Sequence, residues 1–153
     1  MRIALVSCSK SKQKYPSAAA EMYSPSHLFS LSLAYAKKVA DKVFILSAKY
    51  GLLEESEHIT PYEFTLKQLP YNRRVDWAQY VVKQMSPKCD IENDEFIILT
   101  GKDYYETLLP ALKHYSLPLE HLSMGYRMAN LERWLRTYPG HTDSIQNVGR
   151  QNG

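Results

Sequence analysis

Ile3-Ala4-Leu5-Val6 runs directly into Ser7-Cys8-Ser9-Lys10-Ser11-Lys12, and this change from an apolar to a polar, lysine-bearing segment decides the fold. It recurs where Val43-Phe44-Ile45-Leu46 meets Ser47-Ala48-Lys49-Tyr50-Gly51, and where Phe96-Ile97-Ile98-Leu99 meets Thr100-Gly101-Lys102-Asp103. Unbroken apolar runs are typical of strands buried on both faces, as in parallel sheets covered by helices. Ligands of such sheets bind beyond the carboxyl ends of the strands. We therefore expect all three polar loops to share one edge and to form the site.

Segments with helical periodicity separate these strands. We expect helices from Pro25-Ser26 to about Val39, over about Tyr71–Met85, over about Tyr104–Tyr115 and over about Tyr126–Arg136, and a fourth strand over Pro118–Leu122. Crossovers between parallel strands are right-handed in nearly every case. The predicted fold is a three-layer α/β/α domain, Rossmann-like, with a mainly parallel sheet of about four strands over residues 1–138. The polar residues 139–153 are expected to be a disordered tail.

Composition sets the class of protein. The 153 residues, 44% of them hydrophobic, suit one globular domain, and a net charge of +3 is only mildly basic. Two cysteines form no disulfide framework, and no apolar run approaches the length of a membrane span. We expect a soluble cytoplasmic protein with no membrane partner.

The first loop combines hydroxyl groups, backbone amides and positive charge directly after a buried strand. This chemistry suits a phosphate or a carboxylate. Ser7, Ser9, Lys10 and Lys12 are therefore predicted to bind the substrate. The loop is not a Walker loop, because the required glycines are missing. The alternative is a solvated turn whose lysines keep the edge soluble.

The second loop adds aromatic side chains. Ser47, Lys49, Tyr50 and Gly51 supply a hydroxyl, a cation, a ring and a glycine that permits a sharp turn. The ring is suited to stacking on a base and the lysine to holding an anion. Alternatively, Tyr50 only covers the end of the sheet. Tyr23 and Tyr62 are predicted to flank the same edge and to bind the substrate with them.

The third loop supplies a carboxylate. Gly101 and Lys102 are predicted to bind substrate, and Asp103 is a candidate general base or stabiliser of a cation, or else the N-cap of the following helix. Gly125 opens the last predicted helix, so amides beside it are placed to receive an anion, and Arg127 offers a forked contact. A plain strand-to-helix turn is the alternative there.

Cys8 is a second candidate catalytic residue, as a nucleophile. His58 is its candidate base, because it is the histidine that falls in a promising loop. The five histidines are scattered without metal-ligand spacing. No metal and no cofactor is expected.

Several of these stretches together resemble an uncharacterised bacterial and phage family marked by a leading SCSK and an internal SAKYGL. The matching residues are Ser7-Cys8-Ser9-Lys10, Glu21-Met22-Tyr23, Phe29, Ile45–Leu52, Pro61-Tyr62, Gly125 and Trp134-Leu135. That family is distantly similar to the YaaA group, linked to peroxide stress and DNA binding. It is also similar to the uracil-DNA-glycosylase-like domain of archaeal tRNA-guanine transglycosylase relatives, although the glycosylase signature loop is missing here. The resemblance implies a Rossmann-like or uracil-DNA-glycosylase-like fold and a nucleic-acid ligand.

Together these features predict a protein that acts on nucleic acid or nucleobases, with cleavage or exchange of an N-glycosidic bond as the hydrolase-like chemistry. The edge lysines would hold phosphates, Tyr50 or Tyr62 would stack a base, and Asp103 would stabilise an oxocarbenium-like transition state. Two alternatives stay open: an enzyme that acts on a small phosphorylated metabolite or nucleotide, and a non-catalytic DNA-binding accessory protein.

Overall fold

The computed structural model describes residues 1–138, and the tail predicted for residues 139–153 lies outside them. The strands are β1 (Arg2–Ser7), β2 (Ser17–Ala18), β3 (Lys42–Ser47), β4 (Gly51–Glu54), β5 (His58–Ile59), β6 (Glu95–Leu99) and β7 (His114–Ser116). The α-helices are α1 (Ala19–Met22), α2 (His27–Val39), α3 (Tyr71–Met85), α4 (Lys102–Tyr105) and α5 (Met124–Thr137). In the described part of the chain, no helix has both the length and the apolar character needed to cross a membrane.

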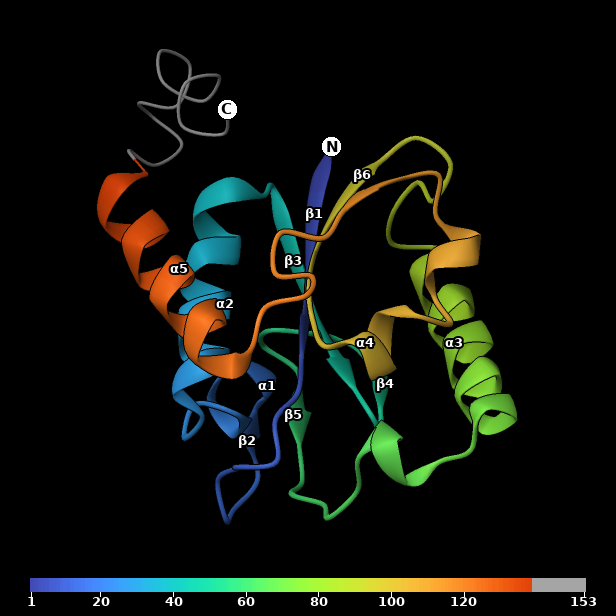
Figure 1. Cartoon of the computed structure of the whole chain (residues 1–153). Helices are drawn as coiled ribbons and strands as arrows, with labels where there is room; N and C mark the ends of the chain where they lie inside the picture. Colours follow the sequence, from blue (N-terminus) through green and yellow to red (C-terminus); the bar gives the residue numbers. More distant parts are fainter. Residues whose placement is uncertain (139–153) are drawn as a thin grey trace.

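The main sheet has the order β4-β3-β1-β6-β7. β1 pairs in parallel with both β3 and β6, and β7 is parallel to β6. The three predicted strands are thus confirmed as parallel neighbours, and their polar loops share one edge, at the bottom of Figure 1. We call this the carboxyl edge, formed by the segments 7–12, 47–51 and 100–103. The point where the chain reverses direction across the sheet lies between β1 and β6, where ligands of doubly wound sheets bind.

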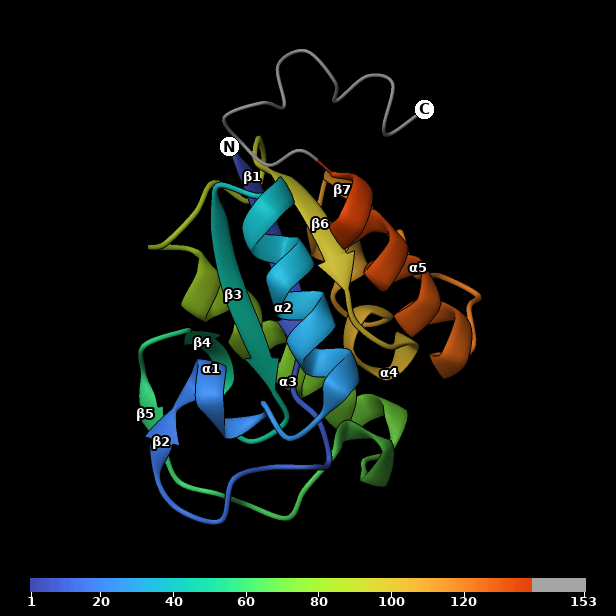
Figure 2. The ribbon, with the colours of Figure 1, turned by 90° about the vertical axis from the view of Figure 1, so that its left-hand side faces the viewer.

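Alternate residues of the central strands enter two separate cores. Ala4 and Val6 of β1 pack with α2 and α5, whereas Ile3 and Leu5 pack with residues of α3. Figure 1 shows α2 and α5 on one face of the sheet and α3 on the other, and Figure 2 shows α2 in front of the sheet, running along the direction of the strands. The α/β fold is confirmed, and the arrangement is that of three layers.

The chain after β6 differs from the sequence prediction. The helix expected over Tyr104–Tyr115 is wrong beyond Tyr105: α4 ends there, and a 3₁₀ helix over Leu109–Ala111 leads into β7. Pro110 lacks a backbone N–H and suits the start of that short helix rather than the interior of a long one. The strand predicted at Pro118–Leu122 is also wrong: residues 118–121 form a turn, and the strand that pairs with β6 is β7, over His114–Ser116.

The sheet also has five strands rather than about four. The extra strand is β4, which pairs antiparallel with β3 through a tight connection. β4 and β7, the two strands that the sequence did not predict, lie at the edges of the sheet. Edge strands are short and partly solvated, so they carry a weaker apolar pattern than central strands.

The first long helix begins at a serine cap. Ser26 Oγ accepts a hydrogen bond from the backbone N–H of Phe29 at 3.2 Å. Replacing Ser26 with alanine should lower the free energy of unfolding by about 1 kcal/mol, because a helix-terminal amide loses its partner. Urea unfolding of Ser26→Ala measures this, with the exposed Ser86→Ala at the end of α3 as the control. Equal stability of both variants would contradict the assignment of the cap.

Candidate functional site

A small second sheet covers part of the carboxyl edge. β2 and β5 pair antiparallel, with Ser17 opposite Ile59. The amide of Ala19 also donates to the carbonyl of Glu57 at 2.8 Å. This pairing folds the segment after β5 back over the edge. It carries Tyr62 to the ends of β1 and β3, which the sequence order alone does not imply.

Three hydroxyl groups from three segments form a hydrogen-bonded chain there. The hydroxyl of Tyr62 lies 2.8 Å from that of Tyr23 and 2.7 Å from Ser47 Oγ. Ser47 Oγ also accepts hydrogen bonds from the backbone amides of Lys49, at 3.2 Å, and Tyr50, at 3.0 Å. Since these amides are its donors, the Ser47 proton is free to be donated to Tyr62. These hydrogen-bonded hydroxyl groups hold the second loop, residues 47–51, against the second sheet.

Two lysines from different loops converge on the Tyr62 ring. Lys12 Nζ lies 4.6 Å from the centre of that ring, and Lys49 Nζ lies 6.0 Å from it. Lys49 Nζ is also 5.3 Å from the centre of the Tyr50 ring. In this arrangement the rings hold ammonium groups by cation–π contacts. The face that Lys12 covers is not open to a stacking base.

Burial keeps Tyr23 and Tyr62 of this cluster neutral even above the ordinary pKa of a tyrosine. It raises the pKa of Tyr23 to about 12, and it raises the pKa of Tyr62 as well, with the neighbouring Cys8 adding to both effects. The tyrosines are therefore neutral hydroxyls near pH 7. Partial burial lowers the pKa of Lys12, an effect that the nearby Cys8 and Glu63 oppose. The cluster has ammonium groups on its rings without tyrosinate to neutralise them.

Beside this cluster lies an open hollow of about 280 Å³. Its walls bring together the predicted residues Lys10, Lys12 and Tyr62, and its full lining is Lys10, Lys12, Gln13, Lys14, Pro61, Tyr62 and Glu63. Lys12 Nζ donates to the carbonyl of Lys10 at 3.3 Å. The first loop therefore presents its lysines to one space.

A second, smaller hollow of about 50 Å³ lies between the ends of β1 and β6. Its lining includes Ser7, Cys8, Ser9, Gly101 and Arg127. Arg127 Nε donates to the carbonyl of Leu122 at 2.9 Å, which fixes the guanidinium in place. Hydroxyls, a thiol and a guanidinium thus meet at the reversal point of the sheet.

The side chain beside Cys8 is not the histidine that the sequence analysis predicted. Its Sγ lies 3.1 Å from the hydroxyl of Tyr104, whose ring meets Trp77 edge to face at 5.7 Å between ring centres. Burial and the nearby Cys8 raise the pKa of Tyr104. His58, the proposed base, lies in β5 with its Cα opposite Ala18. The polar group beside the thiol is therefore a neutral phenol rather than the expected imidazole.

Asp103 points toward α3. Its Oδ1 lies 3.6 Å from Nη1 of Arg74, which also approaches Glu106 Oε1 at 3.8 Å through Nη2. The N-cap of α4 is Gly101, so the alternative role of Asp103 as a cap is wrong. Lys102 is exposed and lies 3.6 Å from Glu106 Oε2, one turn along. These two charged residues are tied to α3 and α4, away from the Tyr62 cluster.

Two predicted glycines have very different surroundings. Gly51 has a φ of +77°, which favours glycine, and a Cβ there would lie 2.2 Å from Gln84 Oε1, so a larger residue would have to displace the Gln84 side chain. A Cβ on Gly125 would meet nothing within 4 Å. Gly125 is the second residue of α5, whose cap is Ser123. Sequence analysis did not predict Gln84, Arg74 and Trp77, which reach the edge from α3. Polar and aromatic residues are common in helices, so nothing in the sequence indicated that these three lie at the edge.

The hydroxyl of Tyr62 joins the segments of the site, so its removal should be measurable. Tyr62→Phe leaves Ser47 and Tyr23 without that partner, and we expect the free energy of unfolding to fall by about 1–2 kcal/mol. Urea unfolding measures the change. Tyr80→Phe, on an exposed ring, is the matched control. If both variants are as stable as the original chain, the hydroxyl chain contributes nothing to stability.

The comparison with protein families covers nearly all of the part of the chain that the structure describes. Residues 3–133 match one protein family, described as a family of unknown function, DUF6884. Searches of curated proteins and of solved structures found no match to this chain. The matched residues include β3, β6, all of β1 except Arg2, the carboxyl edge and most of α5. The chain belongs to the DUF6884 family.

Proposed function

We propose that this protein binds nucleic acid, or a nucleotide-like part of it, at the carboxyl edge. The observation that carries the proposal is the convergence of Lys12 and Lys49 on the Tyr62 ring. Two ammonium groups reach one ring from separate loops, and a bound phosphate would neutralise their like charges. The aromatic rings already hold the two lysine side chains in place, so these side chains lose less conformational freedom when an anion binds.

Nearby groups support phosphate as the anion. Lys10 and Lys14 line the same hollow as Lys12, so more than one phosphate has cations within reach. Arg127 lines the smaller hollow together with Ser7 and Ser9, and its planar donors suit phosphate oxygens. A chain of phosphates is a ligand that uses both hollows. The resemblance to DNA-binding YaaA-type proteins supports nucleic acid over other polyanions.

For the chemistry, cleavage or exchange of an N-glycosidic bond remains the proposal, with Asp103 as the carboxylate and Cys8 as the other candidate. Asp103 would have to act from beside Arg74, which holds it 3.6 Å away. A base-release assay on modified DNA tests this. Asp103→Asn should lose activity, while Glu106→Gln, which alters the other partner of Arg74, should keep it. Base release that survives Asp103→Asn would remove Asp103 from the reaction.

We also propose a cytoplasmic location. Cys8 and Cys89 are free thiols, which suits a reducing compartment. Fractionation of cells that express the protein checks this, and recovery outside the cytoplasm would overturn it.

The binding proposal is tested by fluorescence anisotropy with labelled single- and double-stranded DNA and RNA at two salt concentrations. We expect binding that weakens steeply with salt, because each neutralised phosphate releases counterions. A nucleotide that competes with a shallow salt dependence would instead favour the enzyme of a small phosphorylated metabolite. Binding without any base release would favour the accessory protein. No binding of any of these ligands would overturn the proposal.

A further inference from the structure

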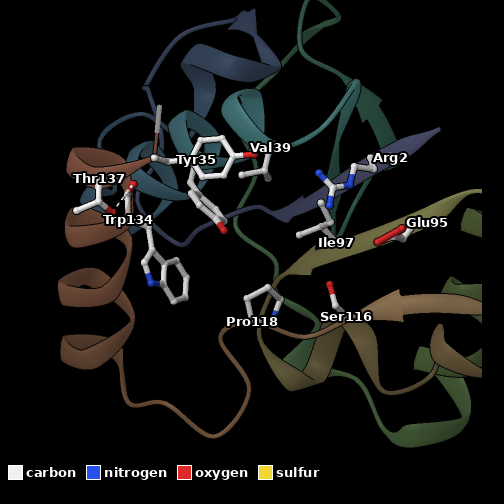
Figure 3. A pocket seen from close by; sticks show the side chains of 10 residues that line it. Arg2, Tyr35, Val39, Glu95, Ile97, Ser116, Pro118, Trp134 and Thr137 are labelled. Carbon is white, nitrogen blue, oxygen red and sulfur yellow. Dashed lines mark hydrogen bonds between the residues drawn. The ribbon is translucent and has the colours of Figure 1, made fainter. Parts of the chain in front are cut away.

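A larger cavity lies at the opposite end of the strands from the carboxyl edge. Its volume is about 400 Å³, within the range of small-molecule sites. It lies between α5 and the face of β6 and β7, and Figure 3 shows side chains from α2, α5, β1, β6 and β7 around it. The lining residues are Arg2, Tyr35, Val39, Glu95, Ile97, Ser116, Pro118, Trp134, Thr137 and Tyr138. None of them belongs to the site described above.

The inner wall of this cavity is aromatic and apolar. The rings of Tyr35 and Trp134 lie 5.2 Å apart with an interplanar angle of 39°, and Tyr138 meets Tyr35 edge to face at 6.5 Å. Val39 and Ile97 are buried beside them. Trp134 is only partly buried, and its indole points into the open space in Figure 3. The wall is suited to a flat ring of the ligand.

The mouth of the cavity carries one charge of each sign. Arg2 and Glu95 are register partners on β1 and β6, and both lie on the α2 side of the sheet, two residues before Ala4 and Ile97. The Arg2 guanidinium is close enough to Tyr35 to lower its pKa, against the rise that burial causes. Among the described residues, neither Arg2 nor Glu95 belongs to an ion pair. A half-buried cation and an adjacent carboxylate are thus both free to meet a ligand.

From this arrangement we infer that the cavity is a binding site for a small aromatic zwitterion of the amino-acid type. The aryl group packs on Tyr35 and Trp134, the carboxylate meets Arg2 and the ammonium meets Glu95. A ligand with only one charge leaves the other charge at the mouth unmatched, and a ligand with both is complementary to the pair. This site is separate from the carboxyl edge, and the inference does not depend on the function proposed for that edge.

Three probes of the same ring test the charge pattern on the unaltered chain: phenylalanine, 3-phenylpropionate and 2-phenylethylamine. Isothermal titration calorimetry should show phenylalanine binding more tightly than either singly charged probe. Arg2→Gln should weaken the binding of phenylalanine and 3-phenylpropionate about tenfold and leave that of 2-phenylethylamine unchanged or tighter. Glu95→Gln should weaken the binding of phenylalanine and 2-phenylethylamine about tenfold and leave that of 3-phenylpropionate unchanged or tighter. Trp134→Ala should weaken all three.

The exposed Arg133→Gln and Glu92→Gln are matched controls that make the same changes of charge away from the cavity. Removal of Lys12 and Lys49 should also leave phenylalanine binding unchanged, which separates this site from the carboxyl edge. The inference is overturned if phenylalanine does not bind at millimolar concentration, or if the three probes bind alike. It is equally overturned if the control variants lose as much affinity as Arg2→Gln and Glu95→Gln. The comparison of probes needs no variant, so it stands even if a variant fails to fold.

Discussion

The chain with Lys12 and Lys49 both replaced by alanine should bind nucleic acid about 100-fold more weakly than the original chain. Each lysine is expected to contribute about 1.5 kcal/mol as a charged hydrogen bond to phosphate, and tenfold in affinity corresponds to 1.4 kcal/mol. Both ammonium groups lie over one ring, so both are placed to contact the same stretch of backbone. Fluorescence anisotropy at fixed salt measures the loss.

The salt dependence of the same variant supplies an independent readout. For double-stranded DNA, the slope of log affinity against log salt should become shallower by about 0.9 for each phosphate contact removed. The control is the chain with the exposed Lys83 and Lys113 replaced by alanine, which has the same net charge. Equal losses in both double variants would mean that overall charge, and not the carboxyl edge, determines binding. An unchanged affinity in the first would show that nucleic acid binds elsewhere.

Gly51→Ala should cost about 2–4 kcal/mol of unfolding free energy, the largest effect expected from one methyl group in this chain. A φ of +77° costs an alanine about 1–2 kcal/mol. Its Cβ would also displace Gln84, whose Oε1 accepts from the amide of Leu52 at 2.7 Å and whose Nε2 donates to the carbonyl of Tyr50 at 3.2 Å. Both hydrogen bonds hold the turn that carries Lys49. We therefore expect weaker nucleic-acid binding together with lower stability.

Urea unfolding measures this loss, and Gly125→Ala is the control within the same chain. An added Cβ there meets open space, and alanine is favoured in a helix by about 1 kcal/mol, so stability should stay equal or rise. A double-mutant cycle with Gln84→Ala separates the clash from the backbone strain. If Gly51→Ala is still destabilising when Gln84 is alanine, backbone conformation is the main cause. A loss below about 0.5 kcal/mol for Gly51→Ala alone would contradict the turn geometry.

The central strands and long helices were predictable because they are strongly patterned. β1, β3 and β6 are buried on both faces, so their apolar runs are continuous, and Ser26 marks the start of α2. The missed elements are weakly patterned. β7 is exposed at all three of its residues, so no burial selects an apolar sequence there. β4 is defined by pairing with β3 after a turn, and its four residues resemble a loop when read alone.

By itself, the sequence determined that three strands are parallel and that their loops share one edge, because burial on both faces leaves a signal in every residue of a strand. The tertiary structure alone decided which side chains meet at that edge. It brought Tyr62 to Ser47, placed Tyr104 rather than His58 beside Cys8, and directed Asp103 toward Arg74. Such contacts depend on the pairing of β2 with β5 and on the rotation along α4. Those long-range and angular relations are set by the packing of the whole chain, and local residue patterns do not encode them.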